Sequence, residues 1–154
     1  MKTACRWTGP FEYVVSTDPA RLDIDRIHRF LSGSYWSPGI PREVVQRAIE
    51  HSLPFGLYAP TGEQAGFARA ISDRATYAYL ADVDVETDHR GRGLGKFLVG
   101  CVLGHPELQA LRRWALATDD AHGLYERHGF AAPAHPEMHM FIERPATELW
   151  PSSD

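Results

Sequence analysis

Two kinds of apolar spacing meet in the middle of the chain. Every second residue from Tyr77 to Val85 is apolar, which predicts a strand over residues 77–86. After a glycine-rich stretch, apolar residues recur three and four positions apart and predict a helix over residues 93–104. The chain is organised around this unit of strand, glycine-rich turn and helix.

The spacing of apolar residues also predicts the other elements. Strands are expected over residues 11–16, 53–59, 64–72, 111–117 and 138–143, and helices over 22–31, 42–51 and 118–128. Antiparallel hairpins followed by a crossover helix predict a mixed α/β (α+β) domain, with helices on both faces of a mixed sheet. We expect one domain over residues 10–145, a loose segment over 1–9 and a tail over 146–154.

The composition limits the classes of function. The 154 residues are 44% apolar and 23% charged, as in ordinary globular proteins, and no run of 18 apolar residues or signal-peptide pattern is visible. We therefore expect a cytoplasmic protein without a membrane partner. The formal net charge of −4 disfavours nucleic-acid binding. The eight histidines and two cysteines lack metal-ligand spacing, so no metal is expected.

The glycine-rich turn has the chemistry of an anion site. A helix start presents about four unpaired backbone amides, and glycines at positions 91, 93 and 95 let the backbone approach a phosphate closely. Arg90, Arg92 and Lys96 add positive charge, which favours a diphosphate. The spacing fits neither a Walker loop, because Phe97 follows Lys96, nor the G-x-G-x-x-G dinucleotide fingerprint.

The turn instead fits the pattern R/Q-x-x-G-x-G/A, with Arg90, Gly93 and Gly95. This resembles motif A of the GCN5-related N-acetyltransferase (GNAT) superfamily, and Leu124 to Phe130 resembles that family's L-Y-x-x-x-G-F segment. The resemblance spans residues 11–144. It implies a central, mostly antiparallel mixed sheet of six to seven strands, acetyl-CoA as cosubstrate, and transfer of its acetyl group to an amine.

The resemblance also implies a set of coenzyme contacts. The strand main chain would bind the acetyl group and pantetheine arm, the turn would bind the pyrophosphate, and residues 118–122 would lie along the coenzyme. Thr87 and Thr118-Asp119 depart from the family's frequent proline and asparagine, and the second departure leaves the pantetheine contact open. The implied residues are Val83, Asp84, Val85, Arg90, Gly91, Arg92, Gly93, Leu94, Gly95, Lys96, Thr118, Asp119, His122 and Tyr125.

Catalytic candidates come from the strand and the last helix. The resemblance places Tyr125 as the acid that protonates the departing thiolate, and the alternative is a tyrosine that only packs on an apolar helix face. Asp82, Asp84 and Glu86 share one strand parity, so Asp84 or Asp82 could accept the amine proton or attract a cationic substrate. They could equally be solvated or paired with Arg69 and Arg113. A bulge, frequent here in the family, would change which side chains share a face.

The acceptor side is expected in the loop between the first two helices. Tyr35 and Trp36 lie there, in a region that borders the acceptor site of the family, with simple packing as the alternative. The first hypothesis is therefore direct acetyl transfer, in a ternary complex, to a primary amine of a small molecule, peptide or protein. The alternatives are a module that binds or senses acyl-CoA without turnover, and a pure interaction domain. Dimers are common among the proteins that the chain resembles.

Overall fold

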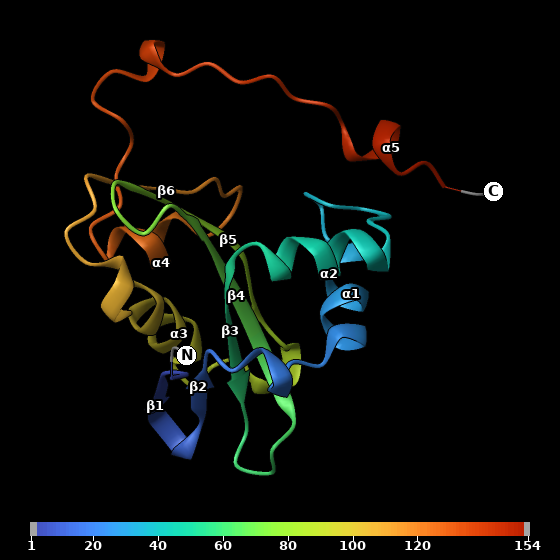
Figure 1. Cartoon of the computed structure of the whole chain (residues 1–154), viewed down its shortest axis with the longest axis vertical. Coiled ribbons are helices and arrows are strands. Elements are labelled where there is room, and N and C mark those ends of the chain that lie inside the picture. Colours follow the sequence, from blue (N-terminus) through green and yellow to red (C-terminus); the bar gives the residue numbers. More distant parts are fainter. Residues whose placement is uncertain (1–2, 153–154) are drawn as a thin grey trace.

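A six-stranded sheet forms the centre of the protein (Figure 1). The structure is a computed structural model that describes residues 3–152. The strands lie side by side in sequence order, and all neighbours are antiparallel except β5 and β6, which are parallel. This confirms the expected mixed, mostly antiparallel sheet. The strands are β1 (Arg6–Thr8), β2 (Val14–Ser16), β3 (Leu53–Tyr58), β4 (Gln64–Ser72), β5 (Tyr77–Val85) and β6 (Arg113–Ala115).

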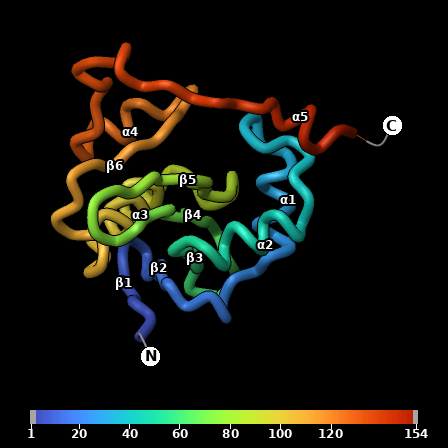
Figure 2. The backbone as a smooth tube through the Cα atoms, turned by 45° about the horizontal axis from the view of Figure 1, so that its top comes forward, coloured from blue at the N-terminus to red at the C-terminus, as the bar shows by residue number. Residues whose placement is uncertain are grey.

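Helices cover both faces of this sheet, as Figures 1 and 2 show. The first begins where the Asp23 carboxylate accepts a hydrogen bond from the Arg26 amide, and the second begins after Pro41, whose carbonyl accepts one from the Val45 amide. The helices are α1 (Ile24–Ser32), α2 (Arg42–Glu50), α3 (Leu94–Leu103), α4 (His122–Glu126) and α5 (Ala146–Leu149). Single 3-10 turns span Pro10–Glu12, Pro19–Arg21, Thr87–His89, Pro106–Leu108 and Pro136–Met138.

The sheet separates two apolar clusters. Because side chains alternate along a strand, Ala68 and Ala70 of β4 face α3, whereas Phe67 faces α1 and α2. The larger cluster joins the sheet to α3 and α4, and the smaller one joins Phe67 to the stripe of α1 and α2. Apolar clusters thus cover the central strands on both faces of the sheet.

A β-bulge interrupts β5 where it faces β4. Ala81 pairs with Arg69 and Asp84 pairs with Phe67, so Asp82 and Val83 together oppose a single β4 residue. Asp82 has a φ of 59°, a left-handed conformation that aspartate tolerates better than most residues. The bulge changes the parity of the strand. Leu80, which shares a parity with the carboxylates in the sequence, packs in the cluster with α3, whereas Asp84 and Glu86 face α1.

Both ends of the chain differ from the sequence-based expectation. Residues 6–8 form β1 within the segment expected to be loose, because they pair with β2. The first expected strand starts only at Val14, since Phe11 and Glu12 adopt positive φ in a 3-10 turn. β6 and α4 are also shorter than expected.

The expected last strand over residues 138–143 is wrong for this chain on its own. Residues 131–145 are exposed and pair with no strand of the described chain, although they include the turn Pro136–Met138. The tail then forms α5, and Trp150 packs against the α1 and α2 cluster. Within residues 3–152, no helix combines the length and the apolar character needed to cross a membrane.

Candidate functional site

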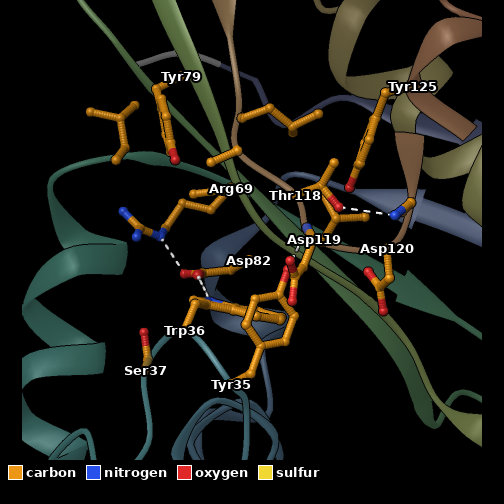
Figure 3. Close-up of a pocket in the computed structure, with 16 residues that line it drawn as sticks. Tyr35, Trp36, Ser37, Arg69, Tyr79, Asp82, Thr118, Asp119, Asp120 and Tyr125 are labelled. Atoms are coloured by element: carbon orange, nitrogen blue, oxygen red, sulfur yellow. Dashed lines mark hydrogen bonds and ion pairs between the residues drawn. The ribbon is translucent and has the colours of Figure 1, made fainter. Parts of the chain in front are cut away.

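A cavity of about 550 Å³ lies beside the bulge of β5 (Figure 3). Strands β5 and β6 pair only over Tyr77–Tyr79 and residues 113–115, and beyond this pairing the cavity lies between them. Three segments form its walls: the α1–α2 loop, the middle of β4 and β5, and the stretch from β6 to α4. The lining residues are Tyr35, Trp36, Ser37, Arg69, Ile71, Tyr79, Leu80, Ala81, Asp82, Val83, Ala117, Thr118, Asp119, Asp120, Ala121 and Tyr125.

Two aromatic residues of the α1–α2 loop tie the walls of the cavity together. The Trp36 indole donates a hydrogen bond to the Asp82 carboxylate (3.1 Å), and the Asp119 amide donates one to the Tyr35 hydroxyl (2.9 Å). The two rings meet edge to face with centroids 5.0 Å apart. Tyr35 and Trp36 therefore lie at the cavity and connect the loop to β5 and to the segment before α4.

Asp82 is fixed in the cavity wall by two donors. Its second carboxylate oxygen accepts a hydrogen bond from Arg69 Nε (2.8 Å), and both side chains are largely buried. The pairing with Arg69 anticipated from the sequence is thus present. Two donors on opposite oxygens therefore fix the position of this carboxylate in the wall of the cavity.

Tyr125 reaches the opposite wall of the same cavity. The residue is buried in α4, and its ring meets that of Phe130 edge to face at 6.0 Å. Figure 3 shows its hydroxyl group directed towards Thr118 and the cavity. Burial raises the pKa of the Tyr125 phenol to about 12, so the hydroxyl stays protonated and acts as a hydrogen-bond donor at neutral pH.

Asp84 lies on the α1 side of the sheet and does not line the cavity. Its carboxylate pairs with the Arg26 guanidinium, which also donates to Glu86 (2.8 Å), and Asp84 and Arg26 are each 4% exposed. Burial raises the pKa of Asp84 to about 6, although the neighbouring Arg26 charge acts in the opposite direction. The structure therefore separates the two expected carboxylates, with Asp82 at the cavity and Asp84 behind the strand.

The glycine-rich turn joins the end of β5 to the start of α3. Gly91 and Gly93 have φ values of 82° and 74°, and an added Cβ would meet no atom within 4 Å at either position. The amides of residues 94–96 precede the first intrahelical bond, which runs from the Phe97 amide to Gly93. Open space, free amides and the exposed Arg92 and Lys96 make a turn that fits a diphosphate.

Side chains below the turn hold its shape. Arg90 Nε donates to the Val85 carbonyl (2.9 Å), and an Arg92 nitrogen donates to the Asp88 carbonyl (2.9 Å). His89 is bonded through Nδ1 to the Tyr13 hydroxyl (2.6 Å). Hydrogen bonds therefore connect the turn to the end of β5 and to the residue before β2.

The expected site residues fall into groups. Tyr35, Trp36, Asp82, Val83, Thr118, Asp119 and Tyr125 line the cavity, whereas Val85, residues 90–96 and the exposed His122 lie outside it. The sequence analysis did not single out Arg26 or Tyr79. In the sequence, an arginine in a helix is expected to be exposed to solvent. The only sign that Arg26 is buried is its place next to Ile27 on the buried side of α1. Within residues 3–152, no group of three or more histidine, cysteine or acidic residues could hold a metal ion.

Comparison with known proteins places the chain. The model of the acetyltransferase (GNAT) family matches residues 22–130, which include the cavity and the glycine-rich turn. The chain belongs to the GNAT family. A candidate GNAT acetyltransferase of Xanthomonas campestris pv. campestris is 51% identical with a TM-score of 0.88, and the match covers 94% of this chain and 100% of that one.

Two further relatives agree with this GNAT assignment. FG08082 of Gibberella zeae, a candidate acetyltransferase, is 34% identical in an alignment of 139 positions, and the match covers 75% of this chain and 77% of that protein. A candidate acetyltransferase of Deinococcus radiodurans has a TM-score of 0.67 at 27% identity, covering 86% of this chain and 88% of that one. GNAT enzymes use acetyl-CoA as cosubstrate, so acetyl transfer from this coenzyme is the activity that the family assignment implies.

Proposed function

We propose that this GNAT protein transfers the acetyl group of acetyl-CoA directly to a primary amine bound in the cavity beside β5. The observation that supports this proposal most directly is the composition of one cavity. Its lining combines the buried phenol of Tyr125, the bulge of β5 and three aspartates, Asp82, Asp119 and Asp120. The residues fit the coenzyme because the turn before α3 offers open space and free amides for a pyrophosphate. Bound acetyl-CoA supplies an activated thioester carbonyl.

The strand bulge supplies groups for the acetyl end. A residue in a bulge is left outside the ladder, and here the extra residue is Asp82 or Val83. A main-chain amide freed from β4 in this way can donate to the thioester oxygen as negative charge develops there. In the transfer the amine nitrogen bonds to the carbonyl carbon, the carbon–sulfur bond breaks, and the sulfur leaves with the electron pair.

Tyr125 would donate a hydrogen bond to that sulfur. A free thiol has a pKa of about 8.5, and the pKa of the buried phenol is about 12, so complete proton transfer to the thiolate is uphill by roughly 5 kcal/mol. The role that this difference supports is stabilisation of the leaving thiolate by a hydrogen bond. The proton that the thiolate finally takes then comes from the acceptor ammonium through water.

The acceptor wall favours a cation. Asp82, Asp119 and Asp120 line the cavity against a single basic residue, Arg69. An alkylamine with a pKa of about 10.4 arrives protonated, and its deprotonation at neutral pH costs about 4 kcal/mol. Since both oxygens of Asp82 already accept hydrogen bonds, we assign this residue to attraction of the cation and assign proton removal to water.

The first test is thermal unfolding with acetyl-CoA, using NADH and ATP as controls. Ligand at 100 times its dissociation constant adds about 2.7 kcal/mol, and a selective rise of about 5 to 10 °C is expected. A panel of cationic, neutral and acidic amines is then assayed for thiol release and for acetylated product by mass spectrometry. We expect the cationic amines to be turned over fastest.

Tyr125→Phe tests the catalytic role. It should lower kcat at least tenfold with little change in the dissociation constant of acetyl-CoA. The matched control is Tyr79→Phe, which removes another phenol from the same cavity and should leave kcat within about threefold. Coenzyme binding without turnover of any amine would support a binding or sensing module, and the absence of a thermal shift would refute the coenzyme site.

A further inference from the structure

Asp82 has a backbone conformation that is unusual for a strand. Its φ of 59° lies in the left-handed region, and among the non-glycine residues of 3–152 with a positive φ it is the one that lies within a strand. Such a conformation carries backbone strain, which persists only where the surrounding structure holds it. The tertiary contacts of Asp82 must therefore offset this strain.

Two side chains from outside β5 hold the Asp82 carboxylate between them (Figure 3). Arg69 Nε, from the neighbouring strand β4, donates to one oxygen at 2.8 Å, and the side chains of Arg69 and Asp82 are 15% and 9% exposed. The Trp36 indole, from the α1–α2 loop, donates to the other oxygen at 3.1 Å. Trp36 is itself held, because its ring packs against those of Phe30 and Tyr35, with centroids 5.7 and 5.0 Å apart. The carboxylate thus joins β5, β4 and the loop.

The main chain of β5 is open to the cavity at the same residue. Asp82 and Val83 have no register partner on β4, and β6 pairs only with the segment Tyr77–Tyr79 of β5. Both Asp82 and Val83 line the cavity. The peptide group that links them turns with the backbone angles of Asp82, so these angles decide where its amide points.

We propose that Arg69 and Trp36 are positioning residues for acetyl transfer and that both act through Asp82. By fixing its carboxylate, they fix its backbone angles and aim the peptide group of the bulge at the thioester oxygen. The inference rests on the proposed function, in which acetyl-CoA places its thioester beside the bulge. It adds a link between the two substrates, because Trp36 belongs to the loop on the acceptor side. A displacement of this loop therefore changes how the thioester is held.

Removal of Arg69 separates positioning from simple attraction of a cation. Of the described residues, Arg69 is the single basic one that lines the cavity, which three aspartates also line. Without it the wall becomes more negative, so attraction alone predicts a lower KM for a cationic amine and no loss of kcat. Positioning predicts that kcat of Arg69→Met falls about tenfold or more while KM for the amine does not rise. Trp36→Phe keeps an aromatic ring but removes the donor, and the same fall in kcat is expected.

A second readout needs no amine. Isotope-edited infrared spectroscopy of acetyl-CoA labelled with carbon-13 at the carbonyl measures the carbonyl stretch of the bound thioester, which a hydrogen bond to its oxygen shifts to lower wavenumber. The wild type should show this shift, and Arg69→Met and Trp36→Phe should each lose about half of it or more, with the dissociation constant of acetyl-CoA changed less than about threefold. Asp82→Ala should lose the shift as well. Asp82→Asn should retain more of it, because asparagine tolerates the left-handed conformation and keeps one oxygen acceptor.

Arg74→Met and Trp7→Phe are the matched controls. Arg74 lies between β4 and β5 and pairs with Glu107 (3.0 Å), Trp7 lies in β1 at the other edge of the sheet, and neither lines the cavity. Both controls should leave kcat and the carbonyl stretch unchanged, and circular dichroism checks that each variant is folded. Should Arg69→Met not fold, Trp36→Phe carries the test alone.

The outcomes separate this inference from the proposed function. A wild type that turns over an amine but shows no carbonyl shift, or variants that keep the full shift and the full kcat, would refute the positioning role and leave acetyl transfer standing. A wild type that binds no acetyl-CoA would refute both. Loss of kcat and of the shift in the variants, at nearly unchanged coenzyme affinity, is the result expected from positioning.

Discussion

Replacing Arg26 with methionine should destabilise the protein strongly. The Arg26 and Asp84 side chains are 4% and 1% exposed, so the change leaves the Asp84 carboxylate buried without its partner. Breaking a buried ion pair from one side costs about 3 to 5 kcal/mol. For a domain of this size, each kcal/mol lowers the melting temperature by about 2 to 4 °C, so the expected loss is about 6 to 20 °C.

The effect should depend on pH in a defined direction. Burial raises the pKa of Asp84 to about 6, above the ordinary 3.8, so between these values the folded state binds more protons than the unfolded state. Stability from this group is therefore present below about pH 4 and is lost as the pH rises through 6. The charge of Arg26 lowers the pKa of Asp84, so this pKa should be higher in a variant that lacks Arg26. The loss of stability with rising pH should therefore continue to a higher pH in that variant.

Urea unfolding at several pH values measures both effects. The variant Arg26→Met should lose more stability than the wild type between pH 5 and pH 8. The double variant Arg26→Met/Asp84→Leu replaces both charges by apolar groups and should recover most of the loss, since such replacements are often neutral. A loss below about 1 kcal/mol for Arg26→Met, or a double variant less stable than the single one, would refute the buried pair as a coupled unit.

Other expectations concern the turn, the thiols and the core. Gly93→Ala, at a φ of 74°, should weaken acetyl-CoA binding at least tenfold. The control Gly62→Ala, at a φ of 94° in a surface turn, should introduce similar backbone strain without changing binding. Equal acetyl-CoA affinities of the two variants by calorimetry would contradict this prediction. Burial raises the pKa of Cys101 to about 12, so iodoacetamide at pH 8 should modify Cys5 first, as peptide mass spectrometry would show. Phe67→Ala should cost about 3 to 5 kcal/mol in urea unfolding, and a loss under 1 kcal/mol would count against its role in the smaller cluster.

The sequence alone predicted the architecture well where the information is local. The spacing of apolar residues located α1, α2, α3 and the three central strands to within two residues. The glycines of the turn could be read because a left-handed backbone and a close approach both require them at fixed positions. The resemblance of the turn and of the Leu124 to Phe130 segment to the GNAT family was confirmed by the family match.

The sequence did not show that the two strand carboxylates, Asp82 and Asp84, lie on different sides of the sheet. Asp82 and Asp84 are two residues apart and would be equivalent on a regular strand. The bulge, the Arg69 side chain of β4 and the Arg26 side chain of α1 distinguish them, and these contacts span between 13 and 58 residues of sequence. Only the folded chain decides which carboxylate faces the cavity.

The fate of residues 138–143 shows the same division. Their apolar residues predicted a strand, but a strand also needs a hydrogen-bonded neighbour, which the local pattern does not contain. Whether this segment has a neighbouring strand is a property of the tertiary structure, and residues 138–143 pair with no strand of the described chain. The sequence thus determined which segments could become helices and strands, whereas partners distant in the chain decided where each lies, because packing energy depends on contacts that no local pattern contains.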